Sequence, residues 1–430
     1  MCGIFGAFAK NNEFFWPKTE LVEAFDLISH RGPDFSNYEI GSNSFIGHKR
    51  LSIIDITENG NQPFASNDGK VKIIFNGEIY NYKALKEGLK AYNFRTNSDT
   101  EVIIAGYISD GDLFFEKLRG MYAFCILDER DSDQRKLLLV RDPSGIKPLY
   151  YYFDNNKLIF ASEIKSIKSI LKGHERDINF EVMKYYISLG YCPDTLTIYK
   201  NVYCLKVGEV FHLDLNSFTH NSRVFYNHFQ SLNESKISNK EKTEFYLENA
   251  IKLNSVSDVP VTYALSGGVD SSLIVAISQK LGLNPSTLTV SFQDLKFDES
   301  KRGLAFSEKL GVKNQLVKPE TSIDLDLINK ILDNFDQPYS DTSAIPFYLL
   351  TKESRKISKV LIGGDGGDEI HNGYPSMNWL PNLLKYKPFL KPIAKSYSQF
   401  DFLKLPKLSE LIRVSRMLNT HNVSDMICIW

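Results

Sequence analysis

Residues 263–273 read Tyr-Ala-Leu-Ser-Gly-Gly-Val-Asp-Ser-Ser-Leu, an apolar run that ends in a glycine-rich turn and continues into a helical pattern. Residues 261–265 have the character of a buried strand, and apolar residues recur at helical spacing from Leu273 to Leu281, just before Gly282. The turn suits phosphate, because glycine lets the backbone approach a ligand and a helix N-terminus presents unpaired N–H groups to an anion. The stretch therefore predicts a strand, a phosphate-binding turn and a helix.

Two other interpretations of this turn were weighed. A Walker A loop needs a lysine for the β- and γ-phosphates, and residues 266–272 contain none. An ordinary turn whose Ser and Asp side chains cap the helix would explain Gly267 and Gly268 alone. The complete string Ser266-Gly-Gly-Val-Asp-Ser-Ser272 is more specific, and it resembles the pyrophosphate loop of ATP pyrophosphatases. In such a loop Asp270 is expected to bind Mg²⁺.

The composition is that of a globular protein. The chain has 430 residues, of which 43% are apolar and 24% charged, and this length allows two or three domains. Its 51 basic and 52 acidic residues give a net charge of −1, so we expect neither nucleic acid nor a membrane as a partner. Five cysteines without metal-like spacing, and a start without secretory features, predict a cytoplasmic protein.

The second residue is a cysteine. Removal of Met1 would expose Cys2 with both a thiol and a free α-amine. Because an α-amine has a pKa of about 7.7 to 8.0, a good fraction is neutral near pH 7 and can take the thiol proton, as in N-terminal nucleophile enzymes. For a cysteine in isolation, inert packing in a first strand is the more common alternative.

The motifs that follow Cys2 favour the nucleophile. They are Met1-Cys-Gly-Ile-Phe-Gly6, His30-Arg-Gly-Pro-Asp34, His48-Lys-Arg-Leu-Ser-Ile-Ile-Asp55, Gln62-Pro-Phe64, Phe75-Asn-Gly-Glu-Ile-Tyr-Asn-Tyr82, Asp99-Thr-Glu101, Gly120-Met-Tyr-Ala-Phe-Cys-Ile-Leu-Asp128, Arg141-Asp-Pro-Ser-Gly-Ile-Lys-Pro-Leu-Tyr150 and Phe160-Ala-Ser-Glu-Ile-Lys165. Together they resemble the class II glutamine amidotransferase domain. The resemblance implies the four-layered αββα sandwich of N-terminal nucleophile hydrolases, an α+β fold.

The resemblance also implies a role for each matched position. Cys2 would attack the side-chain amide of glutamine, form a glutamyl thioester and release ammonia. The Asn76 amide and the Gly77 N–H would form the oxyanion hole, Arg50 would bind the α-carboxylate of glutamine, and Asp99 with nearby polar groups would take its α-ammonium. Without the resemblance, Arg50 and Asp99 would be read as a surface charge and a turn residue. The implied glutamine site comprises Arg50, Leu51, Ser52, Ile53, Ile54, Asn76, Gly77, Glu78 and Asp99.

A polar stretch divides the chain. Residues 231–242 lack apolar periodicity, so we expect a first domain over 1–212, a linker over 213–242 and a second domain over 243–430. In the first domain we expect strands at 71–75, 123–127, 137–140 and 157–161, helices at 18–29 and 100–109, and a last hairpin at 205–211. In the second, strands at 261–265, 286–292, 314–317 and 359–362 with intervening helices predict an α/β domain with a parallel sheet.

Loops after the second-domain strands carry polar motifs, and open α/β sheets bind ligands at such places. The motifs are Asp298-Glu-Ser300, residues 337–346 and Gly363-Gly-Asp-Gly-Gly-Asp-Glu-Ile-His-Asn-Gly-Tyr374. In the last, Asp365, Asp368 and Glu369 would repel one another unless a cation or an amine shares the site. A solvated acidic turn is the alternative, although the apolar residues directly before it favour a site at a strand end.

In motif order, essentially the whole chain resembles glutamine-hydrolysing asparagine synthetases. That family uses ATP to activate a carboxylate as an acyl-adenylate, which ammonia from the first site attacks, and it releases AMP and pyrophosphate. The resemblance implies catalytic roles for Cys2, Asn76, Gly77, Asp365 and Glu369, an ATP site of Leu265, Ser266, Gly267, Gly268, Asp270, Ser271, Val290, Gly363 and Gly364, and Mg²⁺ at Asp270 and Asp368. Gly363 departs from the family pattern, in which serine is usual, and lacks its hydroxyl.

The resemblance leaves the acceptor open. Many chains of this build resemble enzymes that amidate a sugar carboxylate in surface-polysaccharide synthesis, and the motifs do not separate these from users of aspartate. A third interpretation is a glutaminase or regulatory protein whose second site is incomplete. The expected partners are small molecules, namely glutamine, ATP and a carboxylate such as aspartate. A homodimer is compatible with the motifs, which carry no information on oligomeric state.

The end of the sequence carries a further expectation. Residues 408–418 have helical periodicity and residues 426–430 are an apolar run, and both resemble buried segments more than a solvated terminus. Relatives in the resembled family continue further and place there a lysine that balances charge at the acyl-adenylate. We therefore expect the second domain to be incomplete at its C-terminus and the chain as given to be inefficient in the synthetase half-reaction, whether it is a fragment, a naturally shortened relative or half of a split pair.

Overall fold

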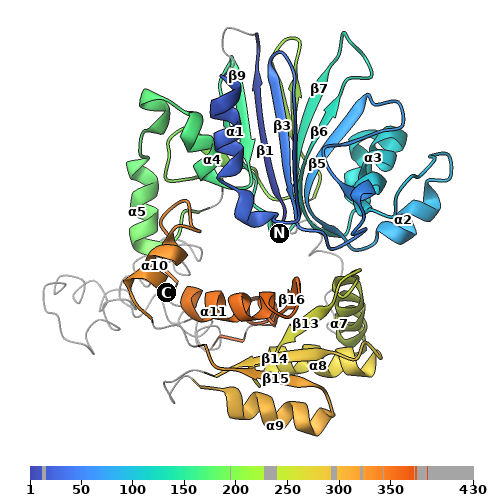
Figure 1. The fold of residues 1–430 in the computed structure, drawn as a ribbon, viewed down its shortest axis with the longest axis vertical. Coiled ribbons are helices and arrows are strands. Elements are labelled where there is room, and N and C mark those ends of the chain that lie inside the picture. Colours follow the sequence, from blue (N-terminus) through green and yellow to red (C-terminus); the bar gives the residue numbers. More distant parts are fainter. Residues whose placement is uncertain are drawn as a thin grey trace, which may run out of the picture.

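The structure is a computed structural model that describes residues 1–11, 16–193, 195–226, 240–291, 298–319, 323–341, 343–371, 373–374 and 385. The patterns noted at 408–418 and 426–430 lie outside these residues. Figure 1 shows two parts, an upper one built on two sheets and a lower one built on a single sheet. Within the described residues, no helix combines the length and the apolar character needed to cross a membrane.

The first domain begins with a six-stranded antiparallel sheet in the order β10, β8, β9, β1, β3, β2. Its strands are β1 Gly3–Ala9, β2 Phe35–Ile40, β3 Ser44–Arg50, β8 Tyr150–Phe153, β9 Lys157–Ala161 and β10 Val202–Cys204. Strand β1 is buried along its whole length. Cys2 therefore directly precedes a strand in the interior of this sheet.

A second antiparallel sheet, in the order β12, β11, β7, β6, β5, β4, lies against the first. Its strands are β4 Phe64–Ala65, β5 Val71–Ile79, β6 Gly120–Asp128, β7 Lys136–Arg141, β11 Glu209–Asp214 and β12 His220–Val224. The long pair β5 and β6 runs in register from Val71 opposite Asp128 to Ile79 opposite Gly120. This pairing carries β5 well past the apolar run that predicted it.

Side-chain alternation builds the layers. Ile4 and Phe8 of β1 enter a core shared with Ile74 of β5, whereas the intervening Phe5 belongs to a second cluster on the other face of the sheet. Helices α1 Lys18–Asp26 and α4 Ile164–Ile170 cover that outer face, and α5 Phe180–Leu189 follows them. The outer face of the second sheet is covered by α2 Tyr82–Gly88 and α3 Asp99–Asp110.

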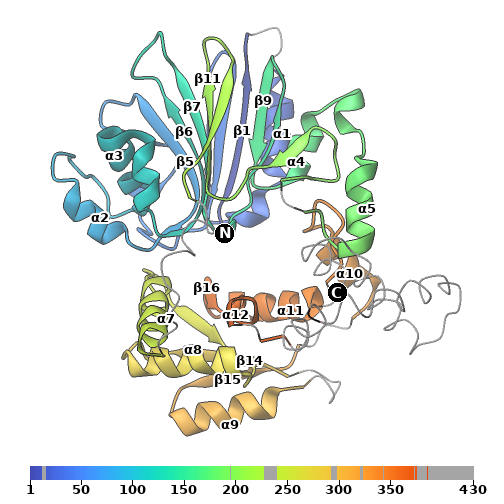
Figure 2. The same ribbon diagram turned by 180° about the vertical axis from the view of Figure 1, so that it is seen from behind.

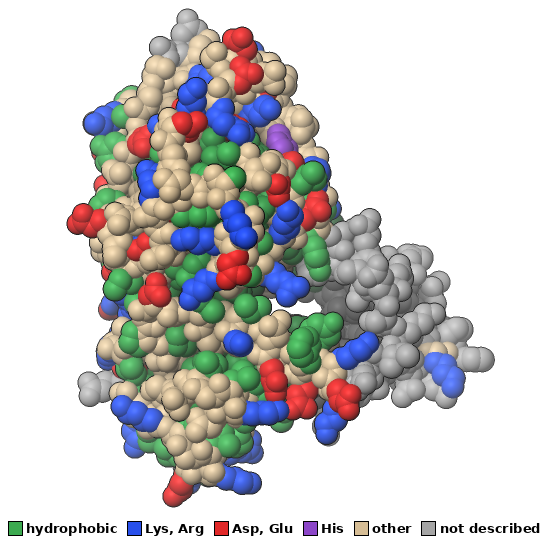
Figure 3. All heavy atoms as spheres, turned by 90° about the vertical axis from the view of Figure 1, so that its right-hand side faces the viewer, with side chains coloured by type: hydrophobic (Ala, Val, Ile, Leu, Met, Phe, Trp, Pro, Cys, Tyr) green, Lys and Arg blue, Asp and Glu red, His purple; other side chains and the backbone are tan. Residues whose placement is uncertain are grey.

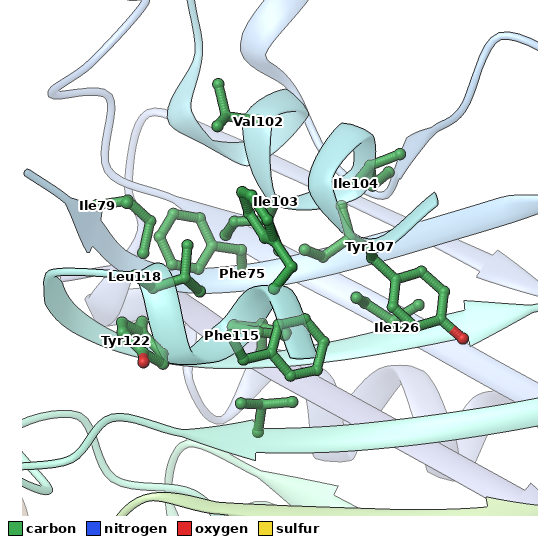
Figure 4. Packing of buried hydrophobic residues seen from close by; sticks show 14 of the residues in the cluster. Phe75, Ile79, Val102, Ile103, Ile104, Tyr107, Phe115, Leu118, Tyr122 and Ile126 are labelled. Carbon is green, nitrogen blue, oxygen red and sulfur yellow. The ribbon is translucent and has the colours of Figure 1, made fainter. Parts of the chain in front are cut away.

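Figure 4 shows this last layer, in which Ile103 and Tyr107 of α3 pack with Phe75 of β5 and Ile126 of β6. Helices therefore lie on both outer faces of two packed sheets. The predicted αββα sandwich is confirmed.

The second domain contains a parallel sheet in the order β15, β14, β13, β16, which confirms the predicted α/β arrangement. Its elements are α7 Lys240–Asn254, β13 Val261–Ala264, α8 Val269–Lys280, β14 Ser286–Val290, α9 Ser300–Leu310, β15 Asn314–Val317, α10 Leu325–Leu332, α11 Ala344–Arg355, β16 Val360–Ile362 and α12 Gly367–His371. The chain moves outward from β13 to β15 and returns on the other side of β13. The strand order therefore reverses between β13 and β16, and a ligand crevice forms at the carboxyl ends of strands at such a reversal.

Several expected boundaries differ from the structure. Strand β12 lies inside the stretch expected to be a linker, and it pairs with β11 as the last hairpin of the second sheet. Residues 205–211, expected to form that hairpin, instead lead from β10 in one sheet to β11 in the other. The sequence of β12, His-Asn-Ser-Arg-Val, is that of an exposed edge strand and lacks apolar alternation, so no period of two could reveal it.

The two domains meet at the edge of the sandwich that carries the N-terminus. In Figures 1 and 2 this edge faces β13, β16 and α11. Lys359 bonds Asp34 across the boundary, and Asp258 bonds Asp55. Figure 3 shows basic and acidic side chains interspersed on one face of the molecule, which agrees with its near-zero net charge.

Candidate active site in two cavities

Cys2 lines a cavity of about 380 Å³ at the edge of the first domain. The Leu51 N–H donates to Cys2 Sγ at 3.3 Å, and Arg31 Nε donates to the Cys2 carbonyl oxygen at 2.9 Å. Arg31 is itself held by Glu163, at 2.8 Å. Burial raises the pKa of the Cys2 thiol, although the nearby N-terminal amine opposes the rise. The thiol is therefore well positioned but protonated, and it needs a base in order to react.

Two amines lie beside this thiol. Burial lowers the pKa of the N-terminal amine to about 5 and lowers the pKa of Lys147 to about 8. Lys147 Nζ contacts Met1 Sδ at 3.0 Å, so Met1 lies between Lys147 and the rest of the cavity. The N-terminal amine, here that of Met1, is therefore largely neutral near pH 7 and can accept a proton, whereas Lys147 is still mostly protonated there.

Arg50, at the end of β3, is buried and is held by the segment that follows it. We call residues 51–57 the Arg50 loop. The Arg50 guanidinium donates to the carbonyl oxygens of Thr57 at 2.7 Å and of Asp55, and to Asn61 Oδ1 at 2.8 Å. Because loop carbonyls surround the guanidinium, the shape of the Arg50 loop sets the direction in which Arg50 points.

Two buried carboxyl groups line the same cavity. Asp99, the first residue of α3, accepts the Ile79 N–H at 2.9 Å, and burial raises the pKa of Asp99 to about 6. Burial and, to a smaller extent, repulsion from Asp99 raise the pKa of Glu78 to about 7. A buried acid pair and a fixed guanidinium in one cavity are complementary to the two charged ends of an amino acid.

Asn76 is fully buried, and neither its Nδ2 nor its Oδ1 has a hydrogen-bond partner among the described residues. Buried amides are normally paired, so this donor is available to a ligand in the cavity. The neighbouring Gly77 has a packing reason to be glycine, because a Cβ there would lie 2.2 Å from the Met121 carbonyl oxygen of β6. The pairing of β5 with β6 thus brings an unpaired donor to the cavity wall.

The first cavity gathers most of the residues predicted for glutamine. They are Cys2, Arg50, Leu51, Ile53, Ile54, Asn76, Gly77, Glu78 and Asp99, whereas Ser52 does not line it. Residues given no role by the sequence also line it, among them Gln62, Ser98, Thr100, Met121, Ile146, Lys147, Phe347, Lys359, Val360 and Leu361. Gln62 and Lys147 stand within the quoted motifs and could have been found there. The second-domain residues carried no signal, because only domain docking brings them to the cavity.

A second cavity of about 500 Å³ lies at the carboxyl ends of β13 and β16. The turn after β13 is ordered by Ser266 Oγ, which accepts the Gly268 N–H at 3.1 Å and lies 3.0 Å from Ser271 Oγ. Gly267 has φ +83°, and a Cβ there would lie 2.7 Å from the backbone of Arg302, so both conformation and packing require glycine. The N-terminus of α8 thereby faces the cavity, as the sequence predicts for a phosphate turn.

The acidic loop after β16 closes the same cavity, which Asp365, Asp368 and Glu369 all line. A Cβ on Gly367 would lie 2.7 Å from Asp270 Cγ, so the carboxylate of α8 lies against the start of α12. Within the described residues, no group of three or more His, Cys, Asp or Glu side chains forms a metal site. Mg²⁺ at nucleotide sites commonly takes one or two carboxylates and completes its shell with phosphate oxygens and water, and Asp270 with Asp368 fits that mode.

The second cavity gathers the predicted nucleotide residues Ser266, Gly268, Asp270, Ser271, Gly363 and Gly364. Leu265, Gly267 and Val290 do not line it; Leu265 lies in the core and Val290 ends β14. Other lining residues, without a predicted role, include Asp341, Ser343, Leu350 and Tyr374. Phe347 of α11 and Leu361 of β16 line both cavities, so the two sites adjoin.

Comparison with known families agrees with this division. Residues 1–226 match the family described as "Glutamine amidotransferase domain", and residues 243–426 match "Asparagine synthase". Fold and matches together define the class of protein: a two-domain glutamine amidotransferase whose second domain is of the asparagine synthase type.

Similar full-length proteins narrow the class. The glutamine-hydrolysing asparagine synthetase 1 of Bacillus subtilis (strain 168) is 36% identical over 402 residues, 90% of this chain and 61% of that protein. A putative glutamine-hydrolysing asparagine synthetase 2 of Methanocaldococcus jannaschii is 32% identical, over 96% of this chain and 85% of that protein. The chain belongs to the family of glutamine-hydrolysing asparagine synthetases. It spans about three fifths of the length of the Bacillus subtilis relative.

Proposed function

We propose that this chain hydrolyses glutamine at Cys2 and uses the ammonia to amidate an ATP-activated carboxylate, with AMP and pyrophosphate as products. Aspartate is the proposed acceptor and asparagine the product. The observation that carries the proposal is the pair of adjoining cavities, one with a nucleophile and one with a phosphate-type turn, that share Phe347 and Leu361.

The charges of the first cavity support glutamine as its ligand. The positive charge of Arg50 can attract the α-carboxylate, and Asp99 with Glu78 can take the α-ammonium. Binding at both charged ends leaves the side-chain amide free to reach Cys2 and Asn76, which line the same cavity. Free ammonia offers none of these contacts, so the cavity favours the amino acid as nitrogen donor.

The chemistry at Cys2 follows from its neighbours. Once Met1 is removed, the α-amine of Cys2 takes the thiol proton and the sulfur attacks the amide carbon of glutamine. The Asn76 amide and the Gly77 N–H would receive the oxyanion, because both line the cavity that Cys2 enters. Ammonia then leaves, and water hydrolyses the thioester to glutamate.

The shared wall supports direct transfer of ammonia. The two residues that line both cavities, Phe347 and Leu361, are apolar, and Val360 also borders the first cavity. Neutral ammonia crosses such a wall more readily than ammonium, because an uncompensated charge is costly to bury. A passage of this kind would deliver ammonia to the second site without release to water.

The second cavity supports an ATP site. The turn at residues 266–271 and the N-terminus of α8 would bind the phosphates. Asp270 and Asp368 would hold Mg²⁺, which supplies neutralising charge to the pyrophosphate when bound. Asp365 and Glu369, on the same acidic loop, would then face the amino group of the acceptor or the incoming ammonia.

The named relatives favour aspartate over the other acceptors considered. Each is called an asparagine synthetase, and the same names disfavour a glutaminase-only protein. A cytoplasmic location is part of the proposal, because five cysteines without metal-like spacing suit a reducing compartment better than a disulfide framework.

The test is product formation from glutamine, ATP and a carboxylate acceptor by the purified chain. Asparagine and pyrophosphate in equal amounts with aspartate are the expected result. Asp270→Asn should reduce pyrophosphate release while leaving glutamine hydrolysis intact, because the two cavities are distinct. An inefficient synthetase site would still release some pyrophosphate. Glutamine hydrolysis with no detectable pyrophosphate release, even slow release, with any acceptor tested would therefore contradict the proposal and favour the glutaminase-only alternative.

Glutamine binding is expected to weaken as the pH falls below about 7. Glu78 and Asp99 have raised pKa values of about 7 and about 6, so both lose their charge as the pH falls through this window. Only ionised carboxylates attract the α-ammonium, so affinity should be full above about pH 7.5 and about tenfold lower near pH 5.5. Calorimetry on a Cys2→Ala protein measures this without hydrolysis.

The matched variant for this pH dependence is Glu78→Gln. It should remove the part of the decline centred near pH 7 and leave the part due to Asp99, which lies lower. Affinity that stays constant from about pH 8 to about pH 5.5 would show that this acid pair does not bind the ammonium group.

A further inference from the structure

We infer that the second domain positions the glutamine site of the first, with Asp258 and Lys359 holding the Arg50 loop in its binding shape. The inference rests on the proposed function, since it concerns how glutamine is bound. Asp258 does not line the glutamine cavity, and Lys359, which borders it, directs its Nζ to Asp34 and Ser52; both are therefore positioning residues rather than catalytic ones.

Lys359 holds the Arg50 loop from one side. Its Nζ donates to Asp34 Oδ2 at 2.6 Å and lies 3.5 Å from the Ser52 carbonyl oxygen. The same Asp34 oxygen accepts the Ser52 N–H at 2.8 Å. Lys359 and Asp34 thus fix both polar groups of the Ser52 backbone.

Asp258 holds the loop from a second point. Its Oδ2 accepts the Asp55 N–H at 2.8 Å, and its own N–H donates to the Ile53 carbonyl oxygen at 3.1 Å. Contacts from the second domain therefore reach residues 52, 53 and 55 of the Arg50 loop, directly or through Asp34. A loop segment held at so many backbone positions has little freedom to rotate its peptides.

The Arg50 loop in turn holds two groups that would meet glutamine. The Leu51 N–H donates to Cys2 Sγ at 3.3 Å. The carbonyls of Asp55 and Thr57 accept from the Arg50 guanidinium. Rotation of these peptides would move the Arg50 guanidinium, and its attraction for a carboxylate depends on the distance between the two charges. Release of the anchors should therefore weaken glutamine binding more than it slows the chemical step.

The anchors are built for positioning rather than for stability. The Lys359 and Asp34 side chains are 30% and 25% exposed, and exposed ion pairs contribute little to folding. Burial acts to raise the pKa of Asp34, but hydrogen bonds from Lys359 and Ser52 outweigh it and leave that pKa below its usual value. Asp34 should therefore stay ionised across the neutral range, and the protein should remain folded without the ion pair.

Lys359 and Asp258 also lie next to the two strands between which the strand order of the sheet reverses. Lys359 directly precedes β16, and Asp258 shortly precedes β13. In Figure 2 β16 lies below the N-terminus of the first domain. The other ends of β13 and β16 lead into the second cavity. The Arg50 loop and the phosphate turn are therefore attached to opposite ends of the same two hydrogen-bonded strands, β13 and β16.

The test measures glutamine binding by calorimetry on the full chain carrying Cys2→Ala, so that binding is measured without hydrolysis. Lys359→Met is expected to weaken glutamine binding about tenfold, as loss of a charge-assisted contact to the loop would. Lys359→Arg keeps the charge and the donors and should restore affinity to within about threefold. Lys356→Met is the matched control. Lys356 Nζ donates to Glu353 at 2.7 Å and, within the described residues, makes no hydrogen bond to the Arg50 loop.

Asp258→Ala is an independent variant with the same expected direction, and it keeps the test decisive should Lys359→Met fail to fold. With Cys2 intact, the KM for glutamine should rise about tenfold in either variant while kcat stays within about twofold. A merely structural loss would lower the active fraction and therefore kcat, so this split separates positioning from stability.

Each outcome of these binding and kinetic measurements either supports or overturns the inference. Weaker binding in the Lys359→Met and Asp258→Ala proteins, with Lys356→Met unchanged, supports the inference. Equal affinity in all three overturns it and leaves the proposed function standing, provided that the Cys2→Ala parent binds glutamine. A parent that binds no glutamine overturns both. A lower kcat at unchanged KM overturns the inference, because it would reflect structural loss or a role in the chemical step rather than positioning of the glutamine site.

Discussion

Replacing Cys2 by alanine is expected to lower glutamine hydrolysis by a factor of at least about 10³, because the thioester cannot form without its sulfur. Cys2 Sγ lines the first cavity, and the Leu51 N–H contacts it at 3.3 Å. Cys125 cannot replace it, since that thiol is buried in the core between the two sheets. The measurement is ammonia release from glutamine by the purified parent and variant.

Two controls accompany this substitution. Cys192→Ala removes a half-buried thiol that does not line the first cavity, and it should hydrolyse glutamine at the parent rate. The Cys2→Ala protein itself should still bind glutamine, because Arg50 and Asp99 are untouched. Hydrolysis by Cys2→Ala at the parent rate would refute the nucleophile.

The same chemistry requires that Met1 be removed. With Met1 in place the nitrogen of Cys2 is an amide and cannot accept a proton, and Met1 itself lines the cavity. Intact mass measurement should therefore find active preparations that begin at Cys2. Full activity in a preparation that retains Met1 would show that another group, such as the Met1 amine beside the thiol, serves as the base.

Asn76→Ala is expected to lower kcat for glutamine hydrolysis about 10²- to 10³-fold, which is the loss of about 3 kcal/mol from a missing oxyanion donor. Neither polar atom of the Asn76 side chain has a hydrogen-bond partner among the described residues, so truncation to alanine breaks no hydrogen bond with them. The cost should therefore fall on the transition state rather than on stability. The KM for glutamine should change little, because Asn76 would contact the amide end and not the charged end.

Steady-state kinetics with the folded variant provide the measurement, and Asn81→Ala provides the control. Asn81 lies just beyond β5 and bonds the Lys117 carbonyl at 3.0 Å, away from the first cavity. If kcat of Asn76→Ala stays within about fivefold of the parent, Asn76 does not supply the donor and the oxyanion must be stabilised elsewhere.

Local sequence pattern was sufficient for elements whose signal is short. The strands expected at 157–161 and 314–317 have those bounds in β9 and β15, and the turn before α8 lies where its glycines predicted. Strand β5 was expected to end at Phe75, yet it continues through Asn76 and Glu78 to Ile79. Polar residues ended the apolar pattern there, but backbone pairing with β6 does not depend on side-chain polarity.

The chemistry-bearing residues were also predictable from sequence, because each stands in a short motif. Cys2, Asn76 and Asp270 could be assigned roles without knowledge of which sheet or helix carries them. The sequence alone could not predict that the Asn76 amide is unpaired or that the pKa values of Glu78 and Asp99 are raised. These properties follow from burial among residues that are distant in the chain.

Only the tertiary structure decided how the two halves meet. Asp34 and Lys359 are separated by 325 positions, and no period or motif links a lysine before β16 to an aspartate before β2. The same holds for Phe347 and Leu361, which read as ordinary core residues in sequence and become the wall between two cavities when the domains dock. Local pattern reports on neighbours within a turn or a strand, whereas contacts between domains depend on surfaces that exist only after each domain has folded.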